Sequence, residues 1–398
     1  MISHNIGYGY NDITLVPAQF TEIEHRSDIN PYIYENILPI FAAPMTTIVS
    51  ESNIDVFIKN GIMPIIPRGM FSHKDDITEL DDFAKRMEML CKGYWTAFSL
   101  NETNKALELI QTGSYDKYIN NTELKFCIDV ANGHMISIYH TAYKLKKYML
   151  EHNFKIRIMT GNIANSETFN EINSSEYEPF RVHYNDTYYN TIDFIRVGIG
   201  GGSGCITSPQ TSVHCAQATL IDNCASWKNY RNTGTKIIAD GGIRNYGDVI
   251  KALALGADYV MIGGLFASTI ESAGDKYAVL DQNNKPTCFC SPEDLNMYKK
   301  CGYFTYGPTN ITCDKIYTEF YGMASKQGQH DMFGKKINTA EGTIKYVEVT
   351  TTLQQWTENM AAYLRSAMSY CNCKSLNKFI GKQTLIPTAY GEINSVNK

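Results

Sequence analysis

The chain has 398 residues, of which 43% are apolar and 19% are charged, and its formal net charge is −5. This composition is ordinary for a soluble globular protein, and the negative charge argues against nucleic acid as the main partner. No run of about 18 apolar residues predicts a membrane span, and the first residues, MISHNIGYGYND, are not typical of a signal peptide. We therefore expect a cytoplasmic protein.

Eleven cysteines are scattered along the chain, and they predict reduced thiols rather than a disulfide framework. Two C-x-C pairs stand out, Cys288/Cys290 and Cys371/Cys373, with Cys301 and Cys313 near the first pair. Their spacing is not that of a common structural zinc site. We expect no metal centre built from these side chains.

Eight short, nearly continuous apolar runs end in glycine or polar residues, as is typical of strands buried on both faces of a parallel sheet. Stretches with helical spacing lie between them, for example over 213–230 and 245–255. Eight strands alternating with helices predict a (β/α)8 TIM barrel, with a doubly wound open sheet as the alternative. The expected strands are Pro39–Met45, Gly61–Ile66, Tyr94–Leu100, Lys125–Ala131, Lys155–Ile163, Phe194–Gly200, Thr235–Gly242 and Tyr259–Gly264.

The carboxyl ends of these strands carry the candidate functional residues, since chemistry in such a barrel lies at that end. Ligand phosphate usually binds at the loops after strands seven and eight. Those loops, 239–242 and 262–264, are glycine-rich and precede helical segments, which favours a phosphate site over glycines that only shape turns. The candidates at the strand ends are Asp129, Asn132, Gly161, Asn162, Cys205, Asp240, Gly242 and Gly264.

The stretch RVGIGGGSGCIT, residues 196–207, runs from a strand into four glycines around Ser203. Such a backbone can approach a ligand closely and present its N–H groups. Backbone dipoles can lower the pKa of a thiol at the tip of the loop, so Cys205 is a candidate nucleophile. A flexible turn with an incidental cysteine is the alternative that the stretch alone leaves open.

Three segments look inserted into an otherwise single catalytic domain over 1–398. Residues 170–190 and 274–314 are polar, rich in Tyr, Asn and Cys, and without a clear period. Residues 325–342 read as a mobile loop, or flap, near the active-site face. Beyond it, apolar residues from Leu353 to Ala367 mark one face of a C-terminal helix.

From about Tyr10 to about Leu385 the chain resembles the inosine-monophosphate dehydrogenase / guanosine-monophosphate reductase family. The long block over 237–264, with the glycine-cysteine loop the right distance before it, makes the resemblance highly specific. The matching pieces are YNDITLVPAQF (10–20), PIFAAPMTTIVS (39–50), IDVANG (128–133), GN (161–162), RVGIGGGSGCIT (196–207), IIADGGIRNYGDVIKALALGADYVMIGG (237–264), FYGMAS (320–325) and AEG (340–342).

The resemblance implies a reaction at C2 of a purine nucleotide, with Cys205 as nucleophile and Thr207 and Glu341 as a proton relay. It places Asp240 on the ribose hydroxyls and Met323 in the substrate site. The 5′-phosphate would be held by Ser203, Gly242, Gly263, Gly264 and Tyr321. A nicotinamide cofactor, NADPH, would lie over Asp129, Asn132, Gly161 and Asn162. A monovalent cation such as K⁺ at Gly200, Gly202 and Cys205 and a homotetramer are further implications.

Two features place the resemblance nearer the GMP reductase branch. Dehydrogenases usually carry a regulatory CBS pair after the second strand, and only about 27 residues separate Ile66 from Tyr94. The Arg-Tyr pair of dehydrogenase flaps is also missing from 325–342, and IDVANG looks like the reductase form of the fourth strand's end. An IMP dehydrogenase without its CBS domain and a catalytically weak, nucleotide-binding paralogue remain as alternatives.

The base pocket departs from the reductase pattern. Pro44 and Thr46 replace Asn and Asp, Pro67 and Arg68 replace His-Lys, and Ser208 replaces Arg. Where reductases read the guanine edge with Ser, Arg and Ser, this chain has Ala324, Asn338 and Ala340. These changes predict intact thiol chemistry with altered base recognition.

Overall fold

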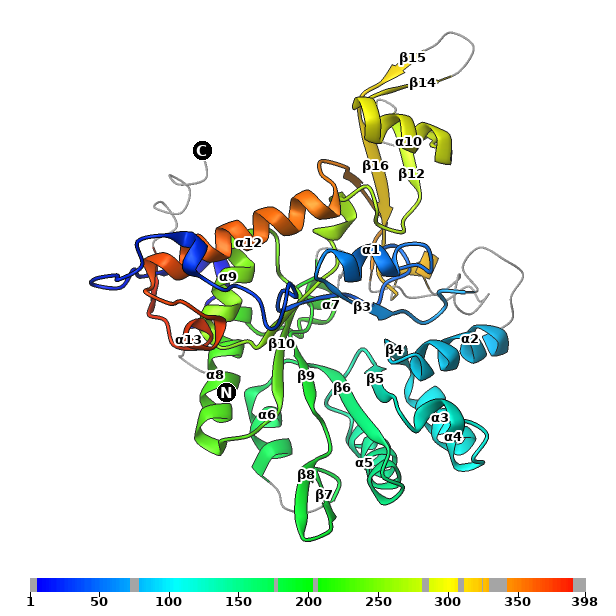
Figure 1. Cartoon of the computed structure of the whole chain (residues 1–398), viewed down its shortest axis with the longest axis vertical. Helices are drawn as coiled ribbons and strands as arrows, with labels where there is room; N and C mark the ends of the chain where they lie inside the picture. The colour runs from blue at the N-terminus through cyan, green and yellow to red at the C-terminus, as the bar shows by residue number, and fades with distance from the viewer. Residues whose placement is uncertain are drawn as a thin grey trace.

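Eight parallel strands of the computed structural model close into a barrel in the order β10-β11-β2-β3-β4-β5-β6-β9 (Figure 1). The structure describes residues 6–71, 79–174, 178–202, 207–280, 286–306, 311–323, 325–328 and 342–388. The predicted TIM barrel is confirmed strand by strand, and the open-sheet alternative is wrong. The barrel strands are β2 (Ile40–Ala42), β3 (Met63–Ile66), β4 (Trp95–Phe98), β5 (Glu123–Asp129), β6 (Lys155–Ile163), β9 (Phe194–Val197), β10 (Lys236–Asp240) and β11 (Tyr259–Ile262).

Alternate residues of each strand point into the barrel, because side chains along a strand alternate between its two faces. Buried apolar side chains such as Ile65, Cys127, Met159 and Ile238 fill the middle of the interior. Below them, at the amino end, four rings from Phe41, Trp95, Phe194 and Tyr259 pack with centroid distances of 5.1–6.3 Å. The barrel is therefore a packed core with two separate mouths, one at each end.

Helices cover the outside of the barrel, and local sequence sets several of their ends. A capping box between Ser99 and Glu102 begins one helix. Asn245 accepts from the Asp248 N–H at the start of another, and Gly256, at φ +116°, ends it. These helices are α1 (Ile54–Lys59), α2 (Glu79–Cys91), α3 (Leu100–Gln111), α4 (Asp116–Ile119), α5 (Ile136–Glu151), α6 (Ser166–Ser174), α7 (Thr207–Thr211), α8 (Gln217–Arg231) and α9 (Tyr246–Leu255).

The predicted C-terminal helix is α12 (Leu353–Tyr370), and it packs against α9 and the loop after β11 as the last outer helix. Its buried Trp356 packs edge to face against Phe266 and tilted against Tyr246, with ring centroids 4.8 and 5.3 Å apart. A short helix, α13 (Leu376–Phe379), follows, and β18 (Leu385–Pro387) pairs with β1 (Ile13–Leu15). The two ends of the described chain are thereby joined beside the barrel.

The two segments that look inserted, 170–190 and 274–314, contain helices and strands in their described parts. The first contains the end of α6 and a hairpin, β7 (Arg181–Tyr184) and β8 (Thr187–Asn190), whose turn residues Asn185 and Asp186 both have positive φ. Positive φ at both positions is what a tight two-residue hairpin turn requires, and Asn and Asp tolerate it.

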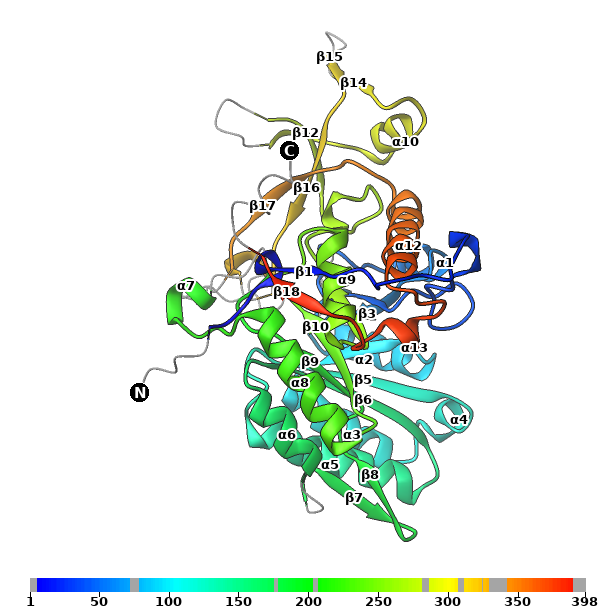
Figure 2. The same cartoon turned by 90° about the vertical axis from the view of Figure 1, so that its left-hand side faces the viewer.

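The second segment forms an ordered lobe that protrudes from the barrel (Figures 1 and 2). Its sheet has the order β13-β12-β16-β17, and a separate small core holds Ile270, Ala278, Cys290, Phe304 and Ile316. The predicted flap, 325–342, lies outside the described residues except for 325–328 and 342. The lobe elements are β12 (Lys276–Leu280), β13 (Pro286–Phe289), α10 (Pro292–Cys301), β14 (Phe304–Tyr306), β15 (Ile311–Cys313), β16 (Ile316–Phe320) and β17 (Lys345–Glu348).

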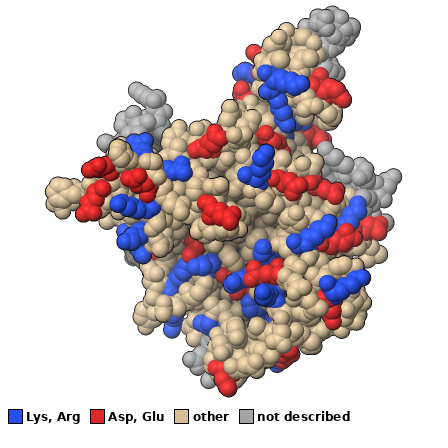
Figure 3. All heavy atoms as spheres, viewed as in Figure 1, with Lys and Arg blue, Asp and Glu red and all other residues tan. Residues whose placement is uncertain are grey.

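Positive and negative side chains are interspersed over the face of the molecule in Figure 3. Among the described helices, none is long and apolar enough to cross a membrane. The described cysteines are free thiols.

Candidate active site

A buried ion network joins three strands at the carboxyl end of the barrel. Arg196 on β9 donates through Nη1 to Asp129 Oδ1 on β5 at 2.5 Å and through Nε to Asp240 Oδ2 on β10 at 2.9 Å. The Arg196 side chain is 10% exposed, and the two carboxylates are 17% and 15% exposed. Burial opposes the guanidinium charge, but Asp240 and Asp129 outweigh it and raise the pKa of Arg196. The arginine is therefore permanently charged and fixes both carboxylates in place.

Asn162, at the end of β6, completes this network. Its Nδ2 donates to Asp240 Oδ2 at 2.8 Å and to the Gly198 carbonyl at 2.7 Å. Asp240 thus receives two donors on one oxygen. Both donors bind Oδ2 of Asp240, and Oδ1 has no hydrogen-bond partner among the described residues.

Glycines at this end allow backbone to pass where a side chain would not fit. A Cβ on Gly161 would lie 2.5 Å from Arg196 Cβ, and φ at Gly161 is +144°. A Cβ on Gly133 would lie 2.6 Å from the Asn162 carbonyl oxygen, to which the Gly133 N–H is hydrogen-bonded at 2.9 Å. Glycine is required at both positions by close approach, not by turn flexibility alone.

The glycine loop after β9 lies against the loop after β10. A Cβ on Gly198 would be 2.2 Å from the Asp240 carbonyl oxygen, and one on Gly201 would be 3.2 Å from Gly242 N. A Cβ on Gly200 would meet Ser208 Cβ at 2.7 Å, so the serine that replaces the family arginine packs beneath the loop. The two backbone segments therefore lie in close contact, which glycine at these positions permits.

The predicted nucleophile Cys205 lies outside the described residues, as do Ser203 and residues 204 and 206. The described chain stops at Gly202 and resumes at Thr207, the first residue of α7. Glu341 also lies outside the described residues, so the structure does not test the Thr207–Glu341 relay.

The predicted phosphate loops come together with the segment after β16. A Cβ on Gly263 would lie 2.8 Å from Met45 Sδ and 3.9 Å from the Phe320 ring. The buried Tyr321 accepts from Thr47 Oγ1 through its carbonyl at 3.1 Å. Tyr321, Gly322 and Met323 are thereby held beside the ends of β2 and β11, where the resemblance places nucleotide contacts.

A buried tyrosine that sequence reasoning did not single out also lies here. The Tyr10 ring is 2% exposed and lies 3.8 Å from the position a Cβ on Gly242 would take. Burial, with the carboxylates of Asp248 and Asp240 nearby, raises the pKa of its phenol well above the usual value. Tyr10 is thus a neutral hydroxyl beneath 239–242, the first of the two predicted phosphate loops.

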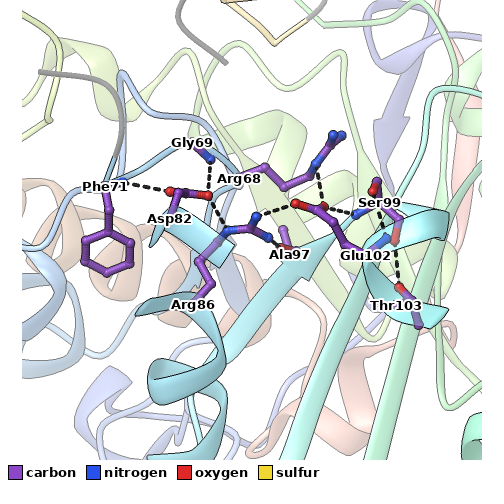
Figure 4. Close-up of polar contacts among 9 residues, drawn as sticks. All are labelled: Arg68, Gly69, Phe71, Asp82, Arg86, Ala97, Ser99, Glu102 and Thr103. Atoms are coloured by element: carbon purple, nitrogen blue, oxygen red, sulfur yellow. Dashed lines mark hydrogen bonds and ion pairs between the residues drawn. The ribbon is translucent and has the colours of Figure 1, made fainter. Parts of the chain in front are cut away.

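The loop after β3 is anchored by a second buried network, shown in Figure 4. Arg86, 1% exposed, donates to Asp82 Oδ2 at 2.7 Å, to the Ala97 carbonyl at 2.8 Å and to Glu102. Asp82 accepts from the Gly69 and Phe71 N–H groups, and Arg68 Nε donates to Glu102 Oε2 at 3.2 Å. Arg68 stands where the resemblance expects a lysine. Its partner Glu102 is itself held by the buried Arg86, so the Arg68 guanidinium is fixed in place.

The predicted site residues separate into two groups. Asp129 and Asp240 meet at Arg196, and Asn162 joins them through Asp240, while Gly242 and Gly263 follow the neighbouring strands β10 and β11. Asn132 does not join the network; its Oδ1 accepts from the His134 N–H at 3.1 Å in a local turn, and it is exposed. Within the described ranges, no group of three His, Cys, Asp or Glu side chains is arranged to hold a metal.

Arg196 is the residue that sequence reasoning missed as a site residue. A signal was present: it is the one charged residue in the run FIRV, and it falls two positions after inward-facing Phe194. A charge facing a barrel interior needs partners, and the aspartates that end β5 and β10 were the available ones.

The chain is similar in sequence to known proteins. A family model described as the IMP dehydrogenase / GMP reductase domain matches residues 7–288. The chain is 35% identical over 185 residues to an inosine-5′-monophosphate dehydrogenase from Cryptosporidium parvum, which covers 46% of this chain and 38% of that one. It is 27% identical over 267 residues to a GMP reductase from Caenorhabditis elegans, covering 66% of this chain and 60% of the relative.

A GMP reductase from Staphylococcus saprophyticus is 25% identical over 379 residues, which cover 93% of this chain and 92% of the relative. The first two matches span less than two thirds of those relatives' own length, whereas this one runs nearly from end to end.

Proposed function

Because this chain belongs to the IMP dehydrogenase / GMP reductase family, we propose that it catalyses the NADPH-dependent reductive deamination of a guanine nucleotide, as in GMP to IMP and ammonia. The observation that favours reduction of a guanine nucleotide over oxidation of IMP is the match to a GMP reductase over 92% of that relative's length. The barrel agrees with it: between the end of β3 at Ile66 and the start of β4 at Trp95, the described residues form only a loop and α2. The proposal therefore keeps 1–398 as one catalytic unit.

The proposed chemistry begins with the Cys205 thiolate, which attacks C2 of the guanine ring. The 2-amino group, protonated by a general acid, leaves as ammonia, and a thioimidate joins Sγ to C2. C2 then receives a hydride from a reduced nicotinamide nucleotide, the C–S bond breaks, and the thiolate returns with IMP released. We assign the proton transfer to the Thr207–Glu341 pair, since a positioned acid–base pair speeds such a step.

The described residues support nucleotide binding at this mouth. Asp240, fixed by Arg196 and Asn162, has a carboxylate oxygen available for the ribose hydroxyls. The backbone of Gly201 against Gly242, with Gly263, Gly264 and Tyr321 beside it, suits the 5′-phosphate. In the proposal Ser203 and Met323 complete the substrate contacts.

The cofactor side would use the opposite edge of the same network. Asp129, held through Oδ1 by Arg196, and the Gly161–Asn162 backbone form its floor, and the exposed Asn132 lies within the next turn. Arg68 adds a cation anchored by Glu102 near the end of β3 (Figure 4). A charged guanidinium at this point favours a phosphorylated nicotinamide nucleotide, NADPH. A K⁺ ion at Gly200, Gly202 and Cys205 belongs to the same proposal.

Base recognition is where we propose a departure from ordinary reductases. Ala324 and Ala340 remove polar partners of the purine edge, which leaves the 2-amino group with fewer acceptors. An unpaired buried polar group costs about 1–3 kcal/mol, or roughly tenfold to a hundredfold in affinity. We therefore propose a preference for a guanine nucleotide altered on the base or the sugar.

A second candidate, oxidation of IMP with NAD, is favoured by one observation: the dehydrogenase from Cryptosporidium parvum is more similar where it aligns, at 35% identity, than the reductases are. We propose a homotetramer in either case, as the family resemblance implies. A monomeric mass by light scattering at micromolar concentration would contradict the tetramer.

A substrate panel tests the proposal. GMP, dGMP, base-modified guanine nucleotides and IMP are each assayed with NADPH, NADH and NAD, following absorbance at 340 nm together with ammonia release. Consumption of NADPH with equimolar ammonia supports the reductase. Accumulation of NADH from IMP and NAD selects the dehydrogenase instead, and GMP outperforming every analogue overturns the altered base preference.

A further inference from the structure

A cavity of about 1000 Å³ opens at the amino end of the barrel, opposite the candidate active site. Its floor is the ring layer of Phe41, Trp95, Phe194 and Tyr259, each the first or second residue of its barrel strand. Its side is formed by the β7–β8 hairpin, which lies at the bottom of the views in Figures 1 and 2. The volume is at the upper end of the range typical of small-molecule sites.

Positive charge dominates the lining of this cavity. Lys125, Arg157 and Lys236 each precede by two residues an inward-facing side chain, Cys127, Met159 and Ile238, so they face the same axis. The lining has five cations against two carboxylates, in a chain whose net charge is −5. The cations are Lys92, Lys125, Arg157, Arg181 and Lys236, and the carboxylates are Glu123 and Asp193.

The two carboxylates do not neutralise this excess. Both carboxylates pair with Arg157: Glu123 accepts from its Nε at 2.9 Å, and Asp193, already bound to the buried Lys146 at 2.8 Å, lies 3.6 Å from its Nη1. Lys236 lies 3.4 Å from Asp258, which also holds Lys228. Within the described parts of the chain, the ammonium groups of Lys125 and Lys92 have no hydrogen bond or ion pair, and Lys125 is half-buried.

Aromatic side chains around the same cavity supply flat surfaces. Tyr188 from β8 is 53% exposed, and Tyr34, Tyr94 and Tyr189 also line the space. Proteins that bind nucleotides whatever the base combine aromatic rings, which stack on the base, with cations, which bind the phosphate. An apolar ligand would leave Lys125 desolvated without a partner, and an inorganic anion would not use the rings.

We propose that this amino-end cavity is a second nucleotide-binding site, in which Lys125 binds phosphate and Tyr188 covers the base. It lies at the opposite end of the strands from the catalytic mouth and takes no part in the proposed reaction. The proposal goes beyond the proposed function and does not rest on it, because the lining residues are separate from every candidate catalytic residue.

ATP is the probe, calorimetric titration is the measurement, and the Lys125 and Tyr188 variants assign the binding event to this cavity rather than to the carboxyl mouth. We expect one ATP per chain, binding weakened at least tenfold by Lys125→Ala and abolished by Lys125→Glu. Tyr188→Ala, an exposed position whose truncation leaves the fold intact, weakens ATP several-fold. Lys144→Ala and Tyr370→Ala, exposed residues on α5 and α12, are the matched controls and leave binding within twofold.

Three results would overturn the proposal: no ATP binding up to about 1 mM, binding unchanged in both Lys125→Ala and Tyr188→Ala, or tripolyphosphate binding as tightly as ATP. Circular dichroism of each variant confirms its fold. If a Lys125 variant does not fold, Tyr188→Ala against Tyr370→Ala decides the outcome. Because GMP turnover is not a readout, failure of the proposed reaction leaves this test intact.

Discussion

The two mouths of the barrel both carry charged side chains on inward-facing positions, but they pair those charges differently. At the carboxyl mouth Arg196 lies between Asp129 and Asp240 and is almost fully buried. At the amino mouth Arg157 is 51% exposed, and Lys125 has no partner within the described residues. Since a buried charge without a partner costs several kcal/mol, only the solvated mouth can leave cations free.

This difference teaches what each mouth can do. The carboxyl network is complete before any ligand arrives, so it fixes geometry, as a reaction that needs aligned atoms requires. The amino mouth holds unneutralised charge in water, so it attracts an anion without positioning it tightly. Rigidity and pairing mark the proposed catalytic end, and spare charge marks the proposed binding end.

The largest expected difference comes from removing one arginine at each mouth. Arg196→Met leaves two buried carboxylates without their cation and should lower the free energy of unfolding by about 3–5 kcal/mol. Arg157→Met removes a half-exposed pair and should cost at most about 1 kcal/mol. Urea unfolding of both variants measures this, and equal losses would contradict the comparison.

The same pair of variants separates the mouths in catalysis. Misplacing reacting groups by about 1 Å can cost about a hundredfold. We therefore expect kcat/KM to fall at least that far in Arg196→Met under conditions where it is folded, and to stay within about threefold in Arg157→Met.

Adding one methyl group at each mouth should have the next largest effect. A Cβ on Gly161 would lie 2.5 Å from Arg196 Cβ at a positive φ, so Gly161→Ala should destabilise by at least about 2 kcal/mol. Gly234 lines the amino cavity, and a Cβ there meets nothing within 4 Å, so Gly234→Ala should change stability by at most about 0.5 kcal/mol. Thermal unfolding of the two variants is the check, and a harmless Gly161→Ala would show that the β6–β9 contact can relax.

Two asparagines give the smallest and sharpest contrast. Asn162 donates to Asp240 and the Gly198 carbonyl, and Asn190 donates to Thr233 at 3.1 Å and Thr235 at 2.9 Å. Each change to alanine should cost about 1 kcal/mol of stability, the usual net value of such hydrogen bonds. Only Asn162→Ala should also lower kcat/KM with GMP. A similar loss of activity in Asn190→Ala would show that the amino end affects catalysis and would contradict the separation of the two ends.

The sequence predicted the barrel because its strands are buried on both faces and read as continuous apolar runs. It missed the β7–β8 hairpin because the turn is Asn-Asp rather than Asn-Gly, and the lobe because its small core comes from short strands far apart in the chain. Strand-end rules found Asp129 and Asp240. They did not reveal Arg196, whose partners lie 67 and 44 residues away.

The amino-end cavity could not be predicted from the strand pattern either. Lys125, Arg157 and Lys236 look like the polar starts of strands, and only the closed barrel brings them around one opening. Pairing between distant strands is set by tertiary register, which a single sequence does not display.

The central claim, that the carboxyl mouth performs thiol chemistry on a guanine nucleotide, is tested most directly by Cys205→Ala. NADPH oxidation and ammonia release are measured with the best nucleotide of the panel, and the Kd of that nucleotide is measured in parallel. The account predicts that turnover is abolished while Kd stays within about tenfold, because a nucleophile acts mainly in the transition state. Turnover of Cys205→Ala within tenfold of the unaltered protein would remove Cys205 from the mechanism and contradict the account.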